Sequence, residues 1–369
     1  MNQTVDVFKI SCAGPADLSA AQALMQSGAL RAQDIVAVMG KTEGNGCVND
    51  FTRDYATRAW CELLAPRLGI DVAAVHERVA LVMSGGTEGV LSPHFTIFAR
   101  RASTADNTNT EKRLAVGVAF TRDFLPEEIG RLAQLNATEK AVTRAMADAG
   151  IDDARDVHFV QIKCSLLTAQ KIADALQRSA PPVTHDTYES MGASRAASAL
   201  GVAVALGEVD ATQVSDADIR HDWSLYSAVA STSAGIELDN NVVIVMGMST
   251  RADSDYLIAH GVMRDAVDVS DLRRCLREDF GIDPDTQADV LRQRVVNILS
   301  KAEASPDGKV RGARHTMLND SDINATRHAR AAVGAALASV LGDTALYVSG
   351  GAEHQGPPGG GPFALILRA

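Results

Sequence analysis

The chain is poor in cysteine and has no excess of positive charge, and both features narrow the class of protein. Its five cysteines are odd in number, are scattered over 369 residues and form no C-x-x-C or zinc-ligand spacing. This favours reduced thiols in a cytoplasmic protein over a disulfide or zinc framework. The formal net charge of −11 argues against partners such as nucleic acid or an anionic membrane surface.

Long hydrophobic runs and several well-known catalytic signatures are also missing. No apolar run approaches the roughly 20 residues of a membrane-spanning helix, and the first ten residues lack the basic and apolar regions of a secretory signal. Gly40-Lys41-Thr42 resembles the end of a P-loop, but Ile35 stands where the first glycine is needed. The sequence contains neither G-x-S-x-G nor H-E-x-x-H, which argues against an α/β-hydrolase or a zincin.

What the chain has instead is a short stretch that occurs three times. Each copy reads Ser, a small residue, Gly, any residue, Glu, and the copies begin at Ser84, Ser233 and Ser349. Each follows an apolar or mixed run that we expect to form a strand. A strand that ends in such a turn exposes a hydroxyl and bare backbone N–H groups, which a ligand can approach closely. Three copies indicate an internal repeat.

Two further elements recur upstream of each serine, always in the order Lys, Arg, Ser. The first is a lysine at the end of an apolar run, and the second is an arginine that opens a helical-looking segment. They are Lys41 and Arg53, Lys163 and Arg195, and Lys301 and Arg327. The spacing differs between copies, as expected for a diverged triplication with different insertions. Packing alone remains an alternative reason for such a repeat.

Alternating strand-like and helix-like segments predict an α/β protein. We place three units at residues 1–103, 113–250 and 254–369, with a polar linker at 104–112. The expected helices include residues 52–68, 194–206 and 325–341, the second beginning at Arg195. We expect a strand at 226–233 and place His94 in a loop.

The repeated residues also predict chemistry. A serine hydroxyl becomes a nucleophile when a base removes its proton, and a lysine with a depressed pKa can be that base. Nearby carboxylates keep a lysine charged. Glu43 follows Lys41 and Glu303 follows Lys301, whereas no acid lies close in sequence after Lys163. This predicts Lys163 and Ser233 as the reactive pair, while the other two pairs bind the substrate.

If the three units converge, their cations form a cup of approximate three-fold symmetry. Planar guanidinium groups bind carbonyl oxygens or delocalised anions through paired N–H donors. Backbone N–H groups at the Ser-Gly turns can hold the oxyanion of a tetrahedral intermediate. The matching small-molecule ligand is a flat, acidic ring with carbonyl groups around its edge.

Five blocks of this sequence resemble the cyanuric acid hydrolase and barbiturase family of cyclic amide hydrolases. The resemblance covers essentially the whole chain and is greatest to the cyanuric acid hydrolases of bacterial s-triazine degradation. It implies a barrel-like prism of three α/β units around a pseudo-three-fold axis, a central active site and a homotetramer. The blocks are residues 38–50, 82–94, 187–195, 301–308 and 347–362.

The resemblance also implies roles for individual residues. It places the nucleophile at Ser233 and the basic lysine at Lys163, with Lys41 and Lys301 completing the other two dyads. The implied substrate-binding residues are Arg53, Ser84, Gly85, Arg195, Ser233, Ala234, Arg327, Ser349 and Gly350. No organic cofactor is implied, but a structural Mg or Ca ion is. Its ligands would be Glu303 and backbone oxygens of Ala352, Gln355, Gly356, Pro357 and Gly360.

The implied reaction is hydrolytic ring opening of cyanuric acid to carboxybiuret, which loses carbon dioxide to give biuret. One alternative is barbiturase, which opens barbituric acid to ureidomalonate. Cyanuric acid is preferred because its own three-fold symmetry matches the cup and because of the block similarity. A second alternative is a pseudo-three-fold binding protein without turnover, against which the intact Lys163 and Ser233 argue.

Overall fold

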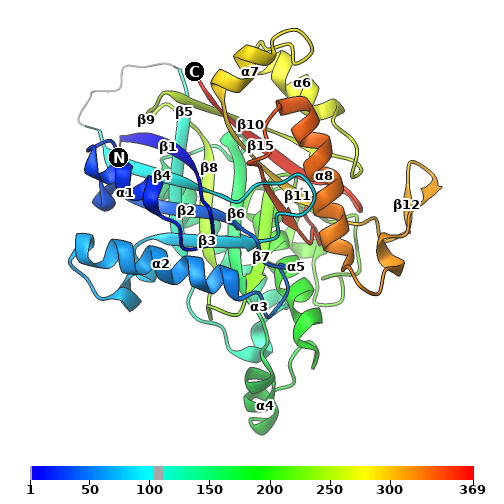
Figure 1. The fold of residues 1–369 in the computed structure, drawn as a ribbon. Helices are drawn as coiled ribbons and strands as arrows, with labels where there is room; N and C mark the ends of the chain where they lie inside the picture. The colour runs from blue at the N-terminus through cyan, green and yellow to red at the C-terminus, as the bar shows by residue number, and fades with distance from the viewer. Residues whose placement is uncertain (1, 104–110) are drawn as a thin grey trace.

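The computed structural model describes residues 2–103 and 111–369 (Figure 1). Residues 104–110, most of the predicted linker, lie outside the described residues. Among the described helices, none is long and apolar enough to cross a membrane. The domain boundaries remain predictions.

The strands and helices fall into three successive groups along the chain. The first contains β1 (Gln3–Ser11), α1 (Ser19–Gln26), η1 (Ala32–Asp34), β2 (Ile35–Thr42), α2 (Phe51–Leu68), η2 (Val72–Glu77), β3 (Ala80–Gly85) and β4 (His94–Ala102). The second contains β5 (Arg113–Phe120), η3 (Pro126–Glu128), α3 (Leu132–Ala149), η4 (Ala154–Asp156), β6 (Val157–Ser165), α4 (Ala169–Gln177), α5 (Thr187–Ala205), η5 (Ala211–Gln213), β7 (Ala230–Gly235) and β8 (Val242–Ser249). The third contains β9 (Ala252–Asp253), β10 (Tyr256–Met263), α6 (Ser270–Glu278), α7 (Ala288–Arg294), β11 (Val295–Ala302), β12 (Lys309–Val310), β13 (Ala313–Arg314), η6 (Met317–Asn319), α8 (Ala325–Leu341), β14 (Tyr347–Gly350) and β15 (Gly361–Arg368).

Each of the three groups forms its own sheet, and the three sheets have the same topology. Their strand orders are β1-β4-β2-β3, β5-β8-β6-β7 and β10-β15-β11-β14, with β9 added beside β1. In each four-strand order the last two strands are parallel and the other pairs antiparallel, and β9 pairs in parallel with β1. A register irregularity recurs near the start of β2, β6 and β11. The shared topology confirms the predicted α/β class and the internal repeat.

Each sheet has one face against helices and the other in a core shared by all three sheets. Alternate residues of a strand point to opposite faces, so Val38 packs with Trp60 of α2 while Met39 enters the shared core. Ile244 and Ile366 join this core from β8 and β15. Figure 1 shows the strands in the interior, with α2 and α8 on the outside. The sheets therefore converge on one region.

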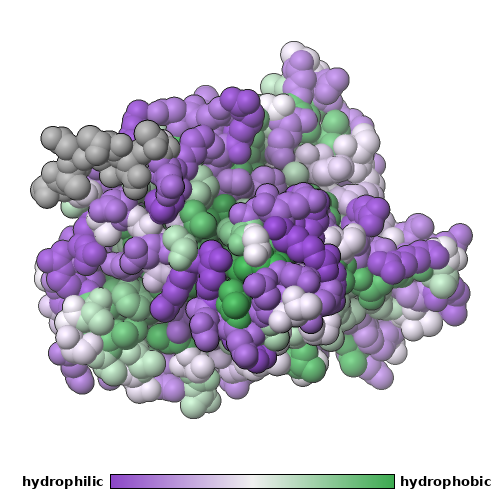
Figure 2. All heavy atoms as spheres, turned by 90° about the horizontal axis from the view of Figure 1, so that it is seen from above, coloured by the Kyte–Doolittle hydropathy of each residue, from purple (hydrophilic) through white to green (hydrophobic). Residues whose placement is uncertain are grey.

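Apolar side chains are mostly withdrawn into these cores. Figure 2, a view from above, shows a face on which hydrophilic residues predominate and hydrophobic ones form small separate groups. Such scattered apolar groups are ordinary on protein surfaces.

Several element boundaries differ from the predictions. Helix α5 begins at Thr187, well before Arg195, because the Asp186 side chain caps it by accepting the Glu189 N–H at 2.8 Å. His94 is not in a loop but is the first, fully buried residue of β4. Strand β7 begins at Ala230, later than predicted.

Candidate active site

The three predicted Lys–Ser pairs lie at the carboxyl ends of the three parallel strand pairs. Strand register places Lys41 opposite Ser84 and Lys163 opposite Ser233. Lys301 lies opposite Ser349 in the same way. All three lysine side chains are fully buried. The repeated sequence order therefore produces a repeated geometry, with a lysine on the inner strand and a serine on the edge strand.

The lysine amines link neighbouring units. Lys163 Nζ donates to the Met83 carbonyl of β3 at 2.9 Å, and Lys301 Nζ donates to the Thr232 carbonyl of β7 at 2.7 Å. Each accepting carbonyl belongs to the residue just before the motif serine of another unit, Ser84 or Ser233. The three dyads consequently meet in one place.

Two of the lysines also contact their own serine directly. Lys41 Nζ lies 3.2 Å from Ser84 Oγ, and Lys301 Nζ lies 3.3 Å from Ser349 Oγ. Ser233 Oγ differs, since it is buried and has no hydrogen-bond partner among the described residues. One of the three hydroxyls thus makes no hydrogen bond within the described part of the chain.

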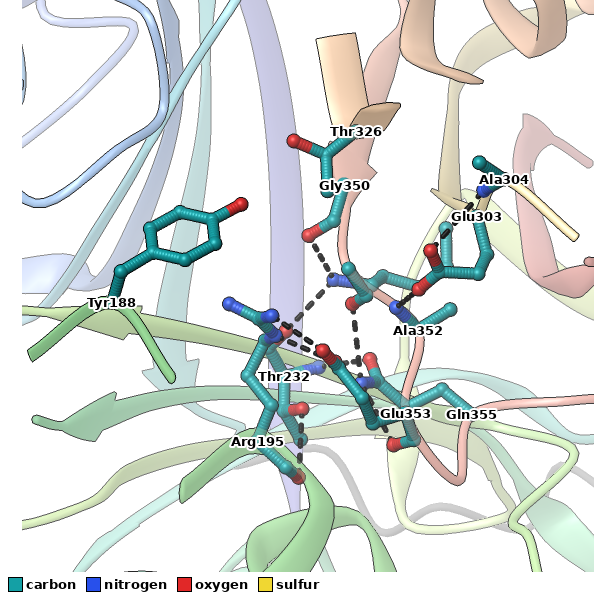
Figure 3. Close-up of polar contacts among 12 residues, drawn as sticks. Tyr188, Arg195, Thr232, Glu303, Ala304, Thr326, Gly350, Ala352, Glu353 and Gln355 are labelled. Carbon is teal, nitrogen blue, oxygen red and sulfur yellow. Dashed lines mark hydrogen bonds and ion pairs between the residues drawn. The ribbon is translucent and has the colours of Figure 1, made fainter. Parts of the chain in front are cut away.

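The predicted arginines reach across unit boundaries as well. Arg53 Nη1 of α2 lies 3.5 Å from the Ala234 carbonyl, and Arg327 Nε of α8 lies 3.1 Å from Glu88. Arg195 of α5 forms a bidentate pair with Glu353, with N–O distances of 2.7 and 2.6 Å (Figure 3). Each arginine therefore contacts the Ser-Gly turn of a different unit.

These groups surround a small cavity of about 20 Å³. Its wall comes from all three units and includes most of the predicted site residues. The lining residues are Gly46, Arg53, Ser84, Gly85, Lys163, Met191, Arg195, Ser233, Ala234, Arg330, Ser349 and Gly350. Arg53 Nε and Ser233 Oγ are buried without hydrogen-bond partners among the described residues. Because buried polar groups normally have partners, the cavity suits a small polar ligand.

Burial lowers the pKa of all three lysines. It places the pKa of Lys41 well below its usual value, helped by the charge of Arg330. Burial, with Arg195 nearby, lowers the pKa of Lys301 to about 7. Burial also lowers the pKa of Lys163, against the opposing effect of the Glu237 carboxylate. Burial therefore makes each amine easier to deprotonate than an exposed lysine, and a neutral amine can act as a base.

The prediction that Lys163, with no acid close in sequence, lacks a carboxylate beside it is wrong. Lys163 is the lysine with a carboxylate partner, because Glu237 Oε1 lies 3.0 Å from its Nζ. Glu43 is exposed, and the Glu303 carboxylate accepts the N–H groups of Ala304 and Ala352. Distance along the sequence did not predict which lysine has a carboxylate partner, because neighbouring side chains in a strand and the turn after it point in different directions.

Two site residues were missed by sequence reasoning. Arg330 is buried, lines the cavity and pairs with Glu88, with N–O distances of 2.8 and 2.5 Å. Arg327 is outside the cavity lining. Arg330 follows it by one helical turn, so helical spacing was an available signal. Glu237 was visible as the last residue of its repeat motif, but no ion pair was assigned to it.

The turn between β14 and β15 holds the carbonyls predicted to bind a metal ion, and the predicted carboxylate, Glu303, directly follows β11. Glu303 is partly buried near Glu353 (Figure 3), and its loss of hydration together with that second carboxylate raises its pKa to about 7. Ala352 and Pro357 carbonyls each accept one backbone N–H at 2.9 Å, and a carbonyl has a second lone pair. The described residues contain no group of three or more His, Cys, Asp or Glu side chains suited to a metal. One carboxylate with carbonyl oxygens fits only a hard cation such as Mg²⁺ or Ca²⁺.

Comparison with known proteins agrees with this geometry. A family model described as amidohydrolase ring-opening protein matches residues 6–368. The chain is 60% identical over 365 residues to a cyanuric acid amidohydrolase of Pseudomonas sp. (strain ADP), covering 99% of both chains. It is 56% identical over 364 residues to that of Enterobacter cloacae, covering 98% of both.

Solved structures show the same fold. A cyanuric acid hydrolase structure, described as an evolutionary innovation by structural concatenation, matches with a TM-score of 0.96 and 58% identity over 100% of both chains. The cyanuric acid hydrolase of A. caulinodans matches with a TM-score of 0.90 and 48% identity over 99% of both. The chain therefore belongs to the amidohydrolase ring-opening family.

Proposed function

We propose that this protein is a cyanuric acid amidohydrolase, which opens the s-triazine ring of cyanuric acid by hydrolysis. The observation that carries the proposal is one cavity whose wall holds three equivalent sets of Ser-Gly groups, one from each unit, together with Lys163 and three arginines. Cyanuric acid has three equivalent carbonyl groups, so each can meet one set. The names of the relatives at 56–60% identity support the same substrate.

In the proposed mechanism, Ser233 is the nucleophile and Lys163 is its base. Neutral Lys163 takes the proton of Ser233 Oγ while Oγ bonds to one ring carbonyl carbon. The tetrahedral oxyanion is stabilised by N–H donors of the Ser-Gly turns. The ring C–N bond then breaks, and the Lys163 ammonium returns the proton to the leaving nitrogen. Water hydrolyses the acyl-enzyme to carboxybiuret, which decarboxylates to biuret.

The Ser233 hydroxyl has no hydrogen-bond partner among the described residues, which supports this choice among the three dyads. The other two hydroxyls, of Ser84 and Ser349, accept a hydrogen bond from a buried lysine. In this proposal those pairs, with Lys41 and Lys301, bind the two carbonyl groups that do not react. Arg53 and Arg195 line the cavity beside them and supply further N–H donors.

Initial rates with cyanuric acid and barbituric acid, measured in parallel on the purified protein, test the substrate. We expect consumption of cyanuric acid with appearance of biuret, and barbituric acid either inert or inhibitory. Turnover of barbituric acid alone would identify a barbiturase instead. Binding of both rings without opening of either would contradict the catalytic proposal and indicate a binding protein.

We also propose that a Mg²⁺ or Ca²⁺ ion stabilises the turn after β14, held by Glu303 and the carbonyls of residues 352, 355, 356, 357 and 360. The ion would supply positive charge beside the partly buried Glu303 and Glu353 carboxylates and would take no part in the reaction steps. At about 100 times its Kd, such an ion adds on the order of 3 kcal/mol to the free energy of unfolding.

Treatment with a chelator is therefore expected to lower the melting temperature, and either ion should restore it. Glu303→Gln is the matched variant, since it removes the one carboxylate ligand and should abolish the response. An unchanged melting temperature after a chelator has removed all bound metal would contradict the proposed site.

By family resemblance, we further propose that the enzyme acts in the cytoplasm as a homotetramer. Sedimentation equilibrium should give the mass of four chains, and cell fractionation should recover the activity with cytoplasmic markers. A monomeric mass at micromolar concentration would contradict the assembly.

A further inference from the structure

The three repeat units differ in what their motif glutamate contacts. Glu88 pairs with Arg330 and Arg327, and Glu353 pairs with Arg195. Glu237, the equivalent residue of the second unit, pairs instead with the dyad lysine of its own unit, Lys163. Among the described residues, this is the one motif glutamate that contacts a dyad lysine. The pseudo-three-fold symmetry is therefore broken at the dyad that contains Ser233.

Glu237 lies between the buried dyad and a separate cleft of about 450 Å³. The Lys163 side chain is 1% exposed, whereas the Glu237 side chain is 12% exposed. The cleft runs between the first and second units and is lined by Thr57, His76, Glu77, Val79, Leu81, Phe120, Asp123, Glu237, Leu238, Asp239, Asn240 and Val242. The carboxylate thus touches Lys163 on one side and this cleft on the other.

Few other charged or titratable groups face this pair. The Arg53 guanidinium of α2 acts on both Lys163 and Glu237, and the Cys164 thiol lies next to Lys163 on β6. His76 lies near Glu237 from the cleft side. Asp123 and Asp239 also line the cleft, and Asp239 is paired with Lys171. Glu237 is therefore the direct anionic partner of Lys163.

We propose that Glu237 is a positioning residue, which orients the Lys163 amine toward Ser233 and stabilises the ammonium that forms when Lys163 takes the serine proton. The inference rests on the function proposed above. The proton moves from Ser233 Oγ to Lys163 Nζ and later to the leaving ring nitrogen, while Glu237 remains a carboxylate throughout. A nucleophile, a base and a third group that orients the base form a recurring catalytic arrangement.

The arrangement also explains why one of three similar dyads can be the reactive one. Lys41 and Lys301 lie beside their serines without an ion pair to a carboxylate among the described residues. An ammonium formed at either would be buried without a direct counter-ion, which is costly. At Lys163 the counter-ion is already in place.

The test compares Glu237→Gln with the wild-type enzyme across pH. We expect kcat for cyanuric acid to fall by about 100-fold or more, with KM changed by less than about 3-fold, as for loss of a group acting on proton transfer. Activity rises with pH as Lys163 becomes neutral. Because a carboxylate raises the pKa of a neighbouring lysine, its removal should move this rising limb of the kcat/KM profile to lower pH.

Two further variants make the test specific. Glu237→Asp keeps the charge and should recover part of kcat and the original position of the rising limb. Glu77→Gln changes an exposed carboxylate of the same cleft and should leave rates and profile unchanged. Melting curves show whether each variant is folded. If Glu237→Gln does not fold, the kcat and pH profile of Glu237→Asp test the inference.

Wild-type kcat in Glu237→Gln would overturn the inference. A loss of kcat with an unmoved rising limb would also overturn it, because that is the result of a purely structural role. Either result, with cyanuric acid opened normally by the wild-type protein, leaves the proposed function intact. Failure of the wild-type protein to open the ring would instead overturn the function on which the inference rests.

Discussion

Replacing Ser233 with alanine should lower kcat for cyanuric acid ring opening by at least about 1000-fold, since loss of a catalytic nucleophile leaves only binding and oxyanion stabilisation. The backbone of Ser233 is part of β7 and does not need the hydroxyl. The hydroxyl also has no hydrogen-bond partner among the described residues. Ser233→Ala should therefore keep the wild-type melting temperature, and its deficit should be confined to activity.

Ser84→Ala and Ser349→Ala are the matched controls, because their hydroxyls occupy equivalent register positions. In the proposed mechanism they bind carbonyl groups that do not react. Each should raise KM and lower kcat by less than about 100-fold, as for a lost hydrogen bond to substrate worth about 1.5–3 kcal/mol. Equal loss of kcat in all three variants, or the largest loss at Ser84 or Ser349, would contradict the choice of Ser233.

Arg195→Gln should cause the largest loss of stability. The guanidinium and the Glu353 carboxylate form a bidentate pair with side chains only 10% and 15% exposed. Removing one partner of a buried pair costs about 3–5 kcal/mol, because the other charge remains uncompensated. Glu303 is a second, partly buried carboxylate near Glu353 and adds to the repulsion. Denaturant unfolding at neutral pH measures this loss.

The loss should depend on pH in a defined direction. Burial acts to raise the pKa of Glu353, but Arg195 outweighs it and the net pKa is lowered. A carboxyl with a lowered pKa stabilises the fold above its unfolded pKa of about 4.3, and this contribution disappears as pH falls. The difference in the free energy of unfolding between wild type and Arg195→Gln should therefore be largest at neutral pH and decrease as the pH falls.

Arg327→Gln provides the comparison for this variant. Arg327 is 37% exposed and contacts Glu88 at 3.1 Å, and Glu88 keeps its second partner Arg330. The expected loss of stability is below about 1 kcal/mol, as for an exposed ion pair. A large loss in Arg327→Gln, or a small one in Arg195→Gln, would contradict the account of these pairs.

Much of the architecture could be predicted because it is repeated. The order Lys, Arg, Ser in each unit, together with the apolar runs before Lys41 and Ser84, predicted strands that the structure contains. In the structure β6 and β7 pair in parallel with Lys163 opposite Ser233, so each predicted residue stands near the carboxyl end of its strand. These features depend on local patterns, which a single sequence records.

The pairing of charges could not be predicted in the same way, because it depends on how distant segments pack within and between the units. Glu237 reaches Lys163 across the strand pair, and Arg195 finds Glu353 in another unit. Neither partner is near in sequence. Nearness in sequence did not identify the ion pairs, since Glu43 lies two residues after Lys41 yet is exposed. Such contacts are set by tertiary packing.

The most direct test of the central claim is the location of the covalent intermediate. Ring opening by Ser233 leaves every atom of cyanuric acid attached to Oγ, so the acyl-enzyme is heavier by one substrate molecule. Acid-quenching during turnover, followed by peptide mass spectrometry, should find this added mass on the peptide that contains Ser233. The same mass on the peptide that contains Ser84 or Ser349 would contradict the account.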